Sequence, residues 1–258
     1  MEIKKALYGL KQAGRIWNEK LNDNLIKIGF IRLKSEPCIY LKLNIFNKII
    51  SIIAVYLCDI LLAGNKKEIE KINLQIKNEC DMTDIGNVDF IIGIKFINCH
   101  DGIILLQLLY LEKILNKFEI SKFYGCNNMK FEENKKLKNK LFDAKKYMQA
   151  VGSLLYLAMG TRPDILFVVS KASRKNKNPI YEDWNNVIKI FKYLKKNKNY
   201  GLKFKRNINI KTYVDADLGG YIETRRPTSF IIIMGGTPIT WYSKLQHYMA
   251  VSIAERIL

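Results

Sequence analysis

Residues 54–64 read AVYLCDILLAG, an apolar run that a single carboxylate, Asp59, interrupts. Two apolar, β-branched runs joined by a short break are typical of antiparallel strands with a tight turn between them. We therefore predict strands over residues 48–56 and 60–63, with Asp59 at the tip of the hairpin. Residues 39–43 have a similar composition and predict a third strand.

Helical periodicity flanks this hairpin on both sides. Apolar residues recur at three- and four-residue spacing over residues 15–28, which predicts a helix that ends at Gly29. The charged segment 66–80 predicts a second helix. A second hairpin over residues 88–107 and a helix over residues 108–118 complete the first half of the chain.

The second half of the chain begins with helices and ends with strands. Three helices are predicted over residues 144–159, 164–175 and 181–196, the second of them capped by Asp164. After Gly201 the pattern changes to strands, which we predict over residues 203–206, 210–215, 228–234 and 239–241. Turns are expected at Gly219-Gly220 and Gly235-Gly236, and another helix begins near Ala250.

Positive charge is concentrated in the middle of the chain. The 258 residues include 43 Lys and Arg against 24 Asp and Glu, a net charge of +19. Residues 131–211 hold 20 Lys and Arg against 6 acidic residues, whereas residues 212–258 are neutral. This distribution favours a polyanionic partner, with nucleic acid ahead of an anionic membrane surface. The alternative is that an AT-rich coding sequence, which enriches Lys, Asn and Ile, accounts for the charge. The basic residues would then form only a solvated surface.

Several classes of protein are disfavoured by composition. The chain has only two histidines, and its five cysteines are far apart, so a zinc site or a disulfide framework is not expected. The first residues do not resemble a signal peptide, and the apolar run 49–63 is too short to span a bilayer and contains Asp59. We expect a soluble intracellular protein, cytoplasmic or nuclear, that is not bound to a membrane.

Short motifs in a fixed order make the sequence similar to the copia family of retrotransposon Pol polyproteins over nearly its whole length. They read KALYGLKQA (5–13), AVYLCDILLAG (54–64), FIIGI (90–94), GSLLYLA (152–158), TRPDI (161–165), YVDAD (213–217), TRRPTS (224–229), GTPITW (236–241) and AVSIAE (250–255). The sequence departs from the family at Gly14, Cys58, Leu218 and Pro227, where the family usually has Pro, Asp, Trp and Ser.

The resemblance implies an α+β fold in three parts. Residues 1–130 would be a partial reverse-transcriptase palm and thumb that lacks the upstream fingers and palm strand. Residues 131–205 would be a basic linker and a helical connection, with the main boundary near residue 131, where residues 131–140 lack apolar periodicity. Residues 206–258 would be a truncated ribonuclease H-like α/β domain.

The resemblance also implies which residues act. Polymerases and ribonucleases H hold two Mg²⁺ ions with clustered carboxylates. Asp59 corresponds to a polymerase carboxylate, and Asp215 and Glu255 correspond to ribonuclease H carboxylates, so these three are the expected catalytic residues and the ligands of Mg²⁺ or Mn²⁺. Cys58 stands at the position of the first polymerase Asp, and a thiol is a soft ligand that suits Mg²⁺ poorly. Both sites are therefore expected to be incomplete.

Three further positions are expected to contact nucleic acid by the same resemblance. Gln12 would approach the incoming nucleotide, Tyr56 lies in the active-site hairpin, and Gly93 lies where the palm approaches the primer backbone. A glycine at position 93 would permit close approach, although it could equally relieve packing.

The favoured function is that of a catalytically inactive polymerase and ribonuclease H fragment. We expect it to retain nonspecific, salt-dependent binding to an RNA–DNA hybrid through residues 131–211 and the palm surface. Three alternatives stay open: an active reverse transcriptase or ribonuclease H completed by another chain, a non-enzymatic module that binds nucleic acid or protein, and a pseudogene product without function.

Overall fold

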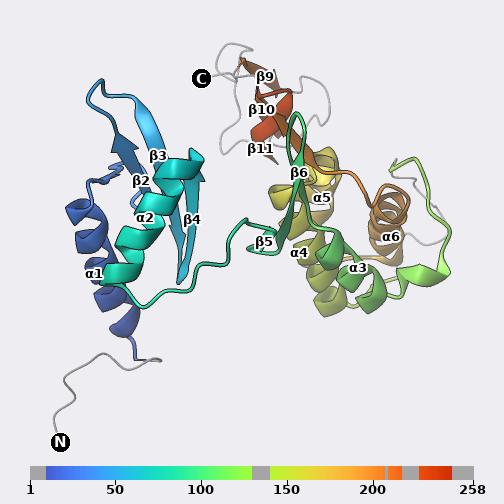
Figure 1. Ribbon diagram of the computed structural model, residues 1–258. Coiled ribbons are helices and arrows are strands. Elements are labelled where there is room, and N and C mark those ends of the chain that lie inside the picture. Colours follow the sequence, from blue (N-terminus) through green and yellow to red (C-terminus); the bar gives the residue numbers. More distant parts are fainter. Residues whose placement is uncertain (1–9, 130–139, 207–208, 217–226, 246–258) are drawn as a thin grey trace, which may run out of the picture. The chain divides into compact units, whose positions relative to one another are not determined.

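A computed structural model describes residues 10–129, 140–206, 209–216 and 227–245 (Figure 1). The chain forms two compact units, Met1–Val88 and Asp89–Leu258. Both units combine helices with antiparallel sheets, which confirms the predicted α+β class. The units divide at residue 88, whereas the sequence composition indicated a boundary near residue 131.

The first unit contains one sheet and two helices. Strands β1 (Ile31–Arg32), β2 (Ile39–Leu43), β3 (Ile49–Tyr56) and β4 (Asp59–Gly64) pair in sequence order as an antiparallel meander. Helix α1 (Ala13–Lys27) precedes the sheet and helix α2 (Lys66–Glu79) follows it, as the periodicity predicted. Asn65 caps α2, since its side chain accepts a hydrogen bond from the Glu68 amide at 2.9 Å.

Both helices of the first unit pack on one face of its sheet. Alternation along β3 places Ser51, Ile53 and Val55 in the interior, where they meet apolar side chains from both helices. The core consists of Leu21, Leu25, Phe30, Tyr40, Ile53, Val55, Ile72 and Ile76. The opposite face of β3 carries Ile52 and Tyr56, which are exposed within this unit.

The described part of the second unit is built around four helices. They are α3 (Leu108–Lys117), α4 (Ala144–Gly160), α5 (Leu166–Ser173) and α6 (Tyr181–Lys196), with short 3₁₀ turns η1 (Ile120–Lys122) and η3 (Pro163–Ile165). Their buried faces form one continuous core, and its fully buried side chains include Leu154, Ile165, Ile190 and Phe191. Helix α6 spans the residues predicted for it.

Two antiparallel sheets accompany these helices. Strands β5 (Phe90–Ile91), β6 (Ile94–Cys99), β7 (Gly102–Leu106) and β8 (Leu202–Lys205) form one sheet, in that order. Strands β9 (Ile210–Ala216), β10 (Pro227–Met234) and β11 (Thr237–Leu245) form the other, in the order β11-β10-β9. Trp241 of β11 attaches this second sheet to α4, because its indole N–H donates to the Ala158 carbonyl at 2.9 Å.

The pairing of β7 with β8 explains why the units do not divide near residue 131. Gly102 lies opposite Lys205 and Leu105 lies opposite Leu202, so segments on either side of the basic linker share one sheet. Helix α3 also joins the common core with α4 and α6. Composition cannot reveal such a pairing, because it depends on hydrogen bonds between residues about a hundred positions apart.

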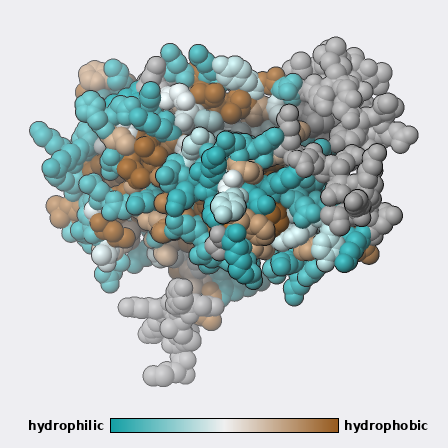
Figure 2. Space-filling view, turned by 90° about the vertical axis from the view of Figure 1, so that its right-hand side faces the viewer, coloured by the Kyte–Doolittle hydropathy of each residue, from teal (hydrophilic) through white to brown (hydrophobic). Residues whose placement is uncertain are grey.

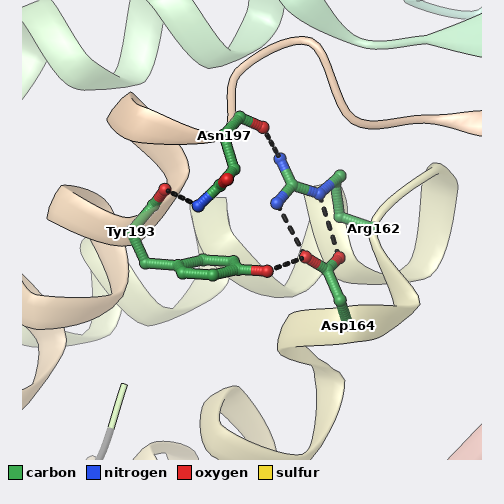
Figure 3. Close-up of polar contacts among 4 residues, drawn as sticks. All are labelled: Arg162, Asp164, Tyr193 and Asn197. Atoms are coloured by element: carbon green, nitrogen blue, oxygen red, sulfur yellow. Dashed lines mark hydrogen bonds and ion pairs between the residues drawn. The ribbon is translucent and has the colours of Figure 1, made fainter. Parts of the chain in front are cut away.

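The junction between α4 and α5 is held by a buried guanidinium (Figure 3). Arg162 is 2% exposed and binds both carboxylate oxygens of Asp164, at 2.9 and 2.7 Å. It also donates to the Asn197 carbonyl at the end of α6, at 2.9 Å. Tyr193 of α6 donates to the same carboxylate at 2.9 Å. The three helices therefore meet at one charge-assisted network.

Asp164 therefore does not act as the predicted helix cap. It lies inside η3, and α5 begins at Leu166 without a side-chain cap. The prediction was wrong because the carboxylate binds the neighbouring buried Arg162, which is a stronger partner than a backbone amide.

In the described residues, no helix is long and apolar enough to cross a membrane.

Removal of the carboxylate charge at position 164 tests this network. We expect Asp164→Asn to lower the free energy of unfolding by about 2 kcal/mol, because Arg162 loses its counter-ion while it stays buried. Urea denaturation measures the loss. The control is Glu112→Gln, which removes the exposed partner of Lys198 at 3.9 Å and should change stability by less than about 0.5 kcal/mol. Equal effects of the two variants would contradict a special role for the buried pair.

Candidate nucleic-acid interface

The β3–β4 hairpin places Asp59 at its tip, as predicted. Tyr56 pairs with Asp59 across the strands, which leaves Leu57 and Cys58 as a two-residue turn. Leu57 has a φ of 53°, a left-handed conformation that non-glycine residues adopt mainly in tight turns. Both turn residues are exposed, and Cys58 is a free thiol.

Asp59 and Tyr56 share the open face of the sheet. Residues directly opposite in an antiparallel pair point to the same side, and the buried face of β3 belongs to Ser51, Ile53 and Val55. Asp59 therefore points away from the helices of this unit, beside a Tyr56 side chain that is 50% exposed. The hairpin thus presents one carboxylate, one phenol and one thiol to solvent.

Gln12 lies at the N-cap position of α1. Its side chain makes no capping hydrogen bond and is exposed, so the amide is available to a ligand.

The described residues include one expected metal ligand in each unit. Asp59 belongs to the first unit, while Asp215 lies on β9 of the second unit, opposite Ser229 of β10. Glu255 lies outside the described residues. Among the described side chains, no group of three or more His, Cys, Asp or Glu is close enough to hold a metal ion.

Gly93 lies in the tight turn between β5 and β6. Ile91 pairs with Ile94, and the two residues between them, Ile92 and Gly93, have φ values of 51° and 75°. The phenol of Tyr156 on α4 donates to the Ile92 carbonyl at 3.0 Å. This turn therefore lies against the outer surface of α4.

The outer surface of α4 is more apolar than a solvated helix face. Met148, Leu155, Tyr156 and Met159 are between 39% and 55% exposed, and together with Gly152 they recur every three or four residues. Gly152 lies within this stripe, and an added Cβ there would meet no atom within 4 Å. We call the residues Met148, Gly152, Leu155, Tyr156 and Met159 the α4 stripe.

An open groove of about 450 Å³ lies along the α4 stripe. Its lining includes Tyr110 of α3 as well as Gln149 and Ser153 of α4. The Tyr110 phenol donates to the Ser153 carbonyl at 3.3 Å, and burial raises the pKa of that phenol. The lining combines two phenols with the polar side chains of Gln149 and Ser153 and the apolar Met148, so it suits a nucleic-acid surface as well as an apolar one.

Two exposed lysines lie about one helical turn from residues that line the groove, whereas Lys146 lies on another side of α4. Lys145 is exposed three positions before Met148 on α4, and Lys113 is exposed three positions after Tyr110 on α3. Lys146 points toward Trp184 of α6, with its ammonium 5.4 Å from the centre of that ring. Both residues line a second cavity of about 550 Å³.

Figure 2 shows hydrophilic side chains over most of the face in view, with apolar side chains exposed in separate patches.

Tyr156 and Gly152 are not among the site residues that the sequence predicts. Both belong to the GSLLYLA motif of α4, and the other side of this helix is buried at Tyr147, Leu154 and Ala158. The sequence does carry a signal for a second apolar side of this helix. Apolar residues within 147–159 cover more of the helix circumference than a surface helix needs for its buried side. Periodicity alone could not tell which of the two apolar sides is exposed.

Comparison with known proteins supports the resemblance. Residues 1–130 match the family model described as "Reverse transcriptase (RNA-dependent DNA polymerase)". The chain is 32% identical to the Retrovirus-related Pol polyprotein from transposon TNT 1-94 of Nicotiana tabacum, over 98% of this chain and 20% of that protein. It is 30% identical to the Putative transposon Ty5-1 protein of Saccharomyces cerevisiae, over 94% of this chain and 81% of that protein.

A third relative extends the same pattern. The Retrovirus-related Pol polyprotein from transposon RE1 of Arabidopsis thaliana is 30% identical over 98% of this chain and 18% of that protein. The chain thus spans about a fifth of the length of the plant polyproteins that it matches. No solved structure gives a significant match. By both the family model and these relatives, the chain belongs to the reverse transcriptases of copia-type retrotransposon Pol polyproteins.

Proposed function

We propose that the chain binds an RNA–DNA hybrid without sequence preference and does not polymerise DNA by itself. The observation that carries the proposal is the groove along the α4 stripe, next to the β5–β6 turn and flanked by Lys113 and Lys145. Lysines would neutralise phosphates, while the small and aromatic residues between them would lie against sugars and base edges.

Gly152 supports a ligand in the groove, close to the backbone of α4, in place of solvent alone. A glycine inside a helix is unfavourable relative to alanine, and no neighbouring atom in this structure requires its small size. Close approach of a ligand to the helix backbone is a physical reason to retain it. The net charge of residues 131–211 favours a nucleic acid as that ligand.

Catalytic inactivity follows from the hairpin tip. Polymerisation needs clustered carboxylates that hold two hard cations, and the tip carries Asp59 next to a thiol. If Mg²⁺ or Mn²⁺ binds here, Asp59 would be its ligand, and at a ribonuclease H site Asp215 and Glu255 would serve. A soft thiol in place of a carboxylate weakens the first of these sites.

The proposal also assigns parts of the molecule to the family's architecture. The first unit would be part of the palm, with the active-site hairpin β3–β4. Helices α4 to α6 would form the connection, and β9, β10 and β11 would be the first strands of the ribonuclease H-like domain. Their antiparallel order, β11-β10-β9, is compatible with that assignment.

Salt dependence tests the electrostatic part of the proposal. If three phosphates are neutralised, the affinity for a labelled RNA–DNA hybrid should fall by roughly 40-fold between about 50 and 200 mM salt. Lys145→Gln should reduce the slope of log affinity against log salt by about 0.9. Lys146→Gln is the matched control, since this neighbour lies over the Trp184 ring. Salt-independent binding would contradict the proposal, as would equal slopes for the two variants.

Gly152→Ala separates stability from binding. We expect the variant to be more stable than the native chain by about 0.5–1 kcal/mol, because alanine is the better helix former. We also expect its affinity for the hybrid to fall several-fold, because the new methyl group lies in the groove. Gly14→Ala is the control, since an added Cβ at Gly14 in α1 also meets nothing within 4 Å. Unchanged hybrid affinity in Gly152→Ala would argue against the groove as the binding site.

Primer extension on an RNA template tests inactivity. We expect no incorporation above a protein-free control with Mg²⁺ or Mn²⁺, either for the native chain or for Asp59→Ala. Incorporation that disappears in Asp59→Ala would overturn the inactive assignment. Cys58→Asp, compared in the same assay, reports whether the thiol alone blocks activity.

A further inference from the structure

The β5–β6 turn has an unfavourable backbone conformation. A two-residue hairpin turn with positive φ at both positions normally contains Asn-Gly, Asp-Gly or Gly-Gly. Here Ile92, a β-branched residue, has a φ of 51° at the first position, where such residues are genuine outliers. Ile92 is also 45% exposed, so burial of its side chain cannot fully account for the backbone conformation of the turn. Contacts from elsewhere in the unit must therefore support it.

Tyr156 supplies such a contact. Its hydroxyl donates to the Ile92 carbonyl at 3.0 Å, which is good hydrogen-bond geometry. The same hydroxyl explains Gly93, because a Cβ on that residue would lie 2.9 Å from the Tyr156 oxygen. Gly93 is thus needed both for its φ of 75° and for the space that the phenol occupies.

The Tyr156 ring is itself held by α3. It packs edge-on against Tyr110, with ring centroids 4.7 Å apart and an interplanar angle of 61°. Tyr110 in turn donates to the Ser153 carbonyl of α4. The phenol is therefore oriented by two helices before it reaches the turn.

We propose that Tyr156 is a positioning residue that holds the β5–β6 turn against the α4 stripe. The hydrogen bond links residues 64 positions apart, and it joins the turn to α4 through Tyr156, which itself lines the groove. A hybrid would then meet one preformed surface in place of a helix and an independently mobile turn, which lowers the cost of ordering on binding. The part of this inference that concerns hybrid affinity rests on the proposed function, whereas the support of the turn does not.

Hydrogen exchange measured on the full chain tests the support of the turn. In Tyr156→Phe the amides of residues 90–96 should exchange about fivefold faster, as expected for the loss of one hydrogen bond of ordinary net strength. Amides of β10 and β11 should be unchanged. Tyr147→Phe is the matched control, because it removes a phenol hydroxyl of the same helix that donates to the Ala172 carbonyl at 2.9 Å, on the buried side of α4. If both variants leave residues 90–96 within twofold of the native rates, the proposal is wrong.

A rescue variant separates support of the turn from a general structural effect. Ile92→Asn creates the Asn-Gly pair that this turn type favours, so the backbone needs less external support. In that background, Tyr156→Phe should accelerate exchange of residues 90–96 by less than twofold. A fivefold effect that persists in the Ile92→Asn background would show that relief of the turn conformation is not what Tyr156 provides.

Hybrid affinity, measured on the same variants, tests the consequence for binding. Tyr156→Phe should weaken binding of the labelled RNA–DNA hybrid about fivefold and Tyr147→Phe less than twofold. Adding Ile92→Asn to Tyr156→Phe should restore most of the lost affinity. If exchange accelerates while affinity is unchanged, Tyr156 does not position the interface. If no version of the chain binds the hybrid, the proposed function fails, and the exchange rates still decide whether Tyr156 holds the turn.

Discussion

The buried guanidinium of Arg162 is the interaction on which the second unit depends. A charge that is 2% exposed is costly to bury unless every donor finds a partner. Arg162 lies in the loop after α4, and its hydrogen-bond partners come from η3 and from the end of α6. The rings of Tyr193 and Tyr200 lie 5.7 and 5.6 Å from its guanidinium. Burial, and then the nearby Asp164 carboxylate, raise the pKa of the Tyr193 phenol. The network can form only when the three helices are already in place, so it favours this one arrangement over alternatives.

The same junction determines where α4 lies. The residues before Arg162 fix the end of α4 against Gln107. Thr161 donates a hydrogen bond to the buried Gln107 side chain at 3.1 Å, and an added Cβ at Gly160 would collide with the same side chain. One side of α4 then fills the core, and Trp241 of β11 is hydrogen-bonded to the end of the helix. The opposite side, the α4 stripe, is left to the β5–β6 turn and to solvent. Core packing therefore prepares the surface that we assign to nucleic acid.

The hairpin at residues 54–64 illustrates how fold and chemistry separate. Strand pairing, alternate burial along β3 and a two-residue turn do not depend on a carboxylate at position 58. A cysteine can occupy that position without any change in the pairing, although it changes which cation the tip could hold. By our proposal, a chain of this family can thus keep the hairpin while a thiol stands where a carboxylate ligand is expected.

Local pattern was sufficient for most of the secondary structure of the described residues, for the α+β class and for the position of Asp59 at a hairpin tip. These features depend on periodicities of two and 3.6 residues, which neighbouring residues carry by themselves. The tertiary structure alone decided that β8 pairs with β7, that Asp164 binds Arg162 in place of capping a helix, and that Tyr156 reaches the Ile92 carbonyl. In each of these contacts, packing determines which partner a group meets. For β8 and Tyr156 that partner is also far away along the chain, so the pattern of neighbouring residues cannot reveal it.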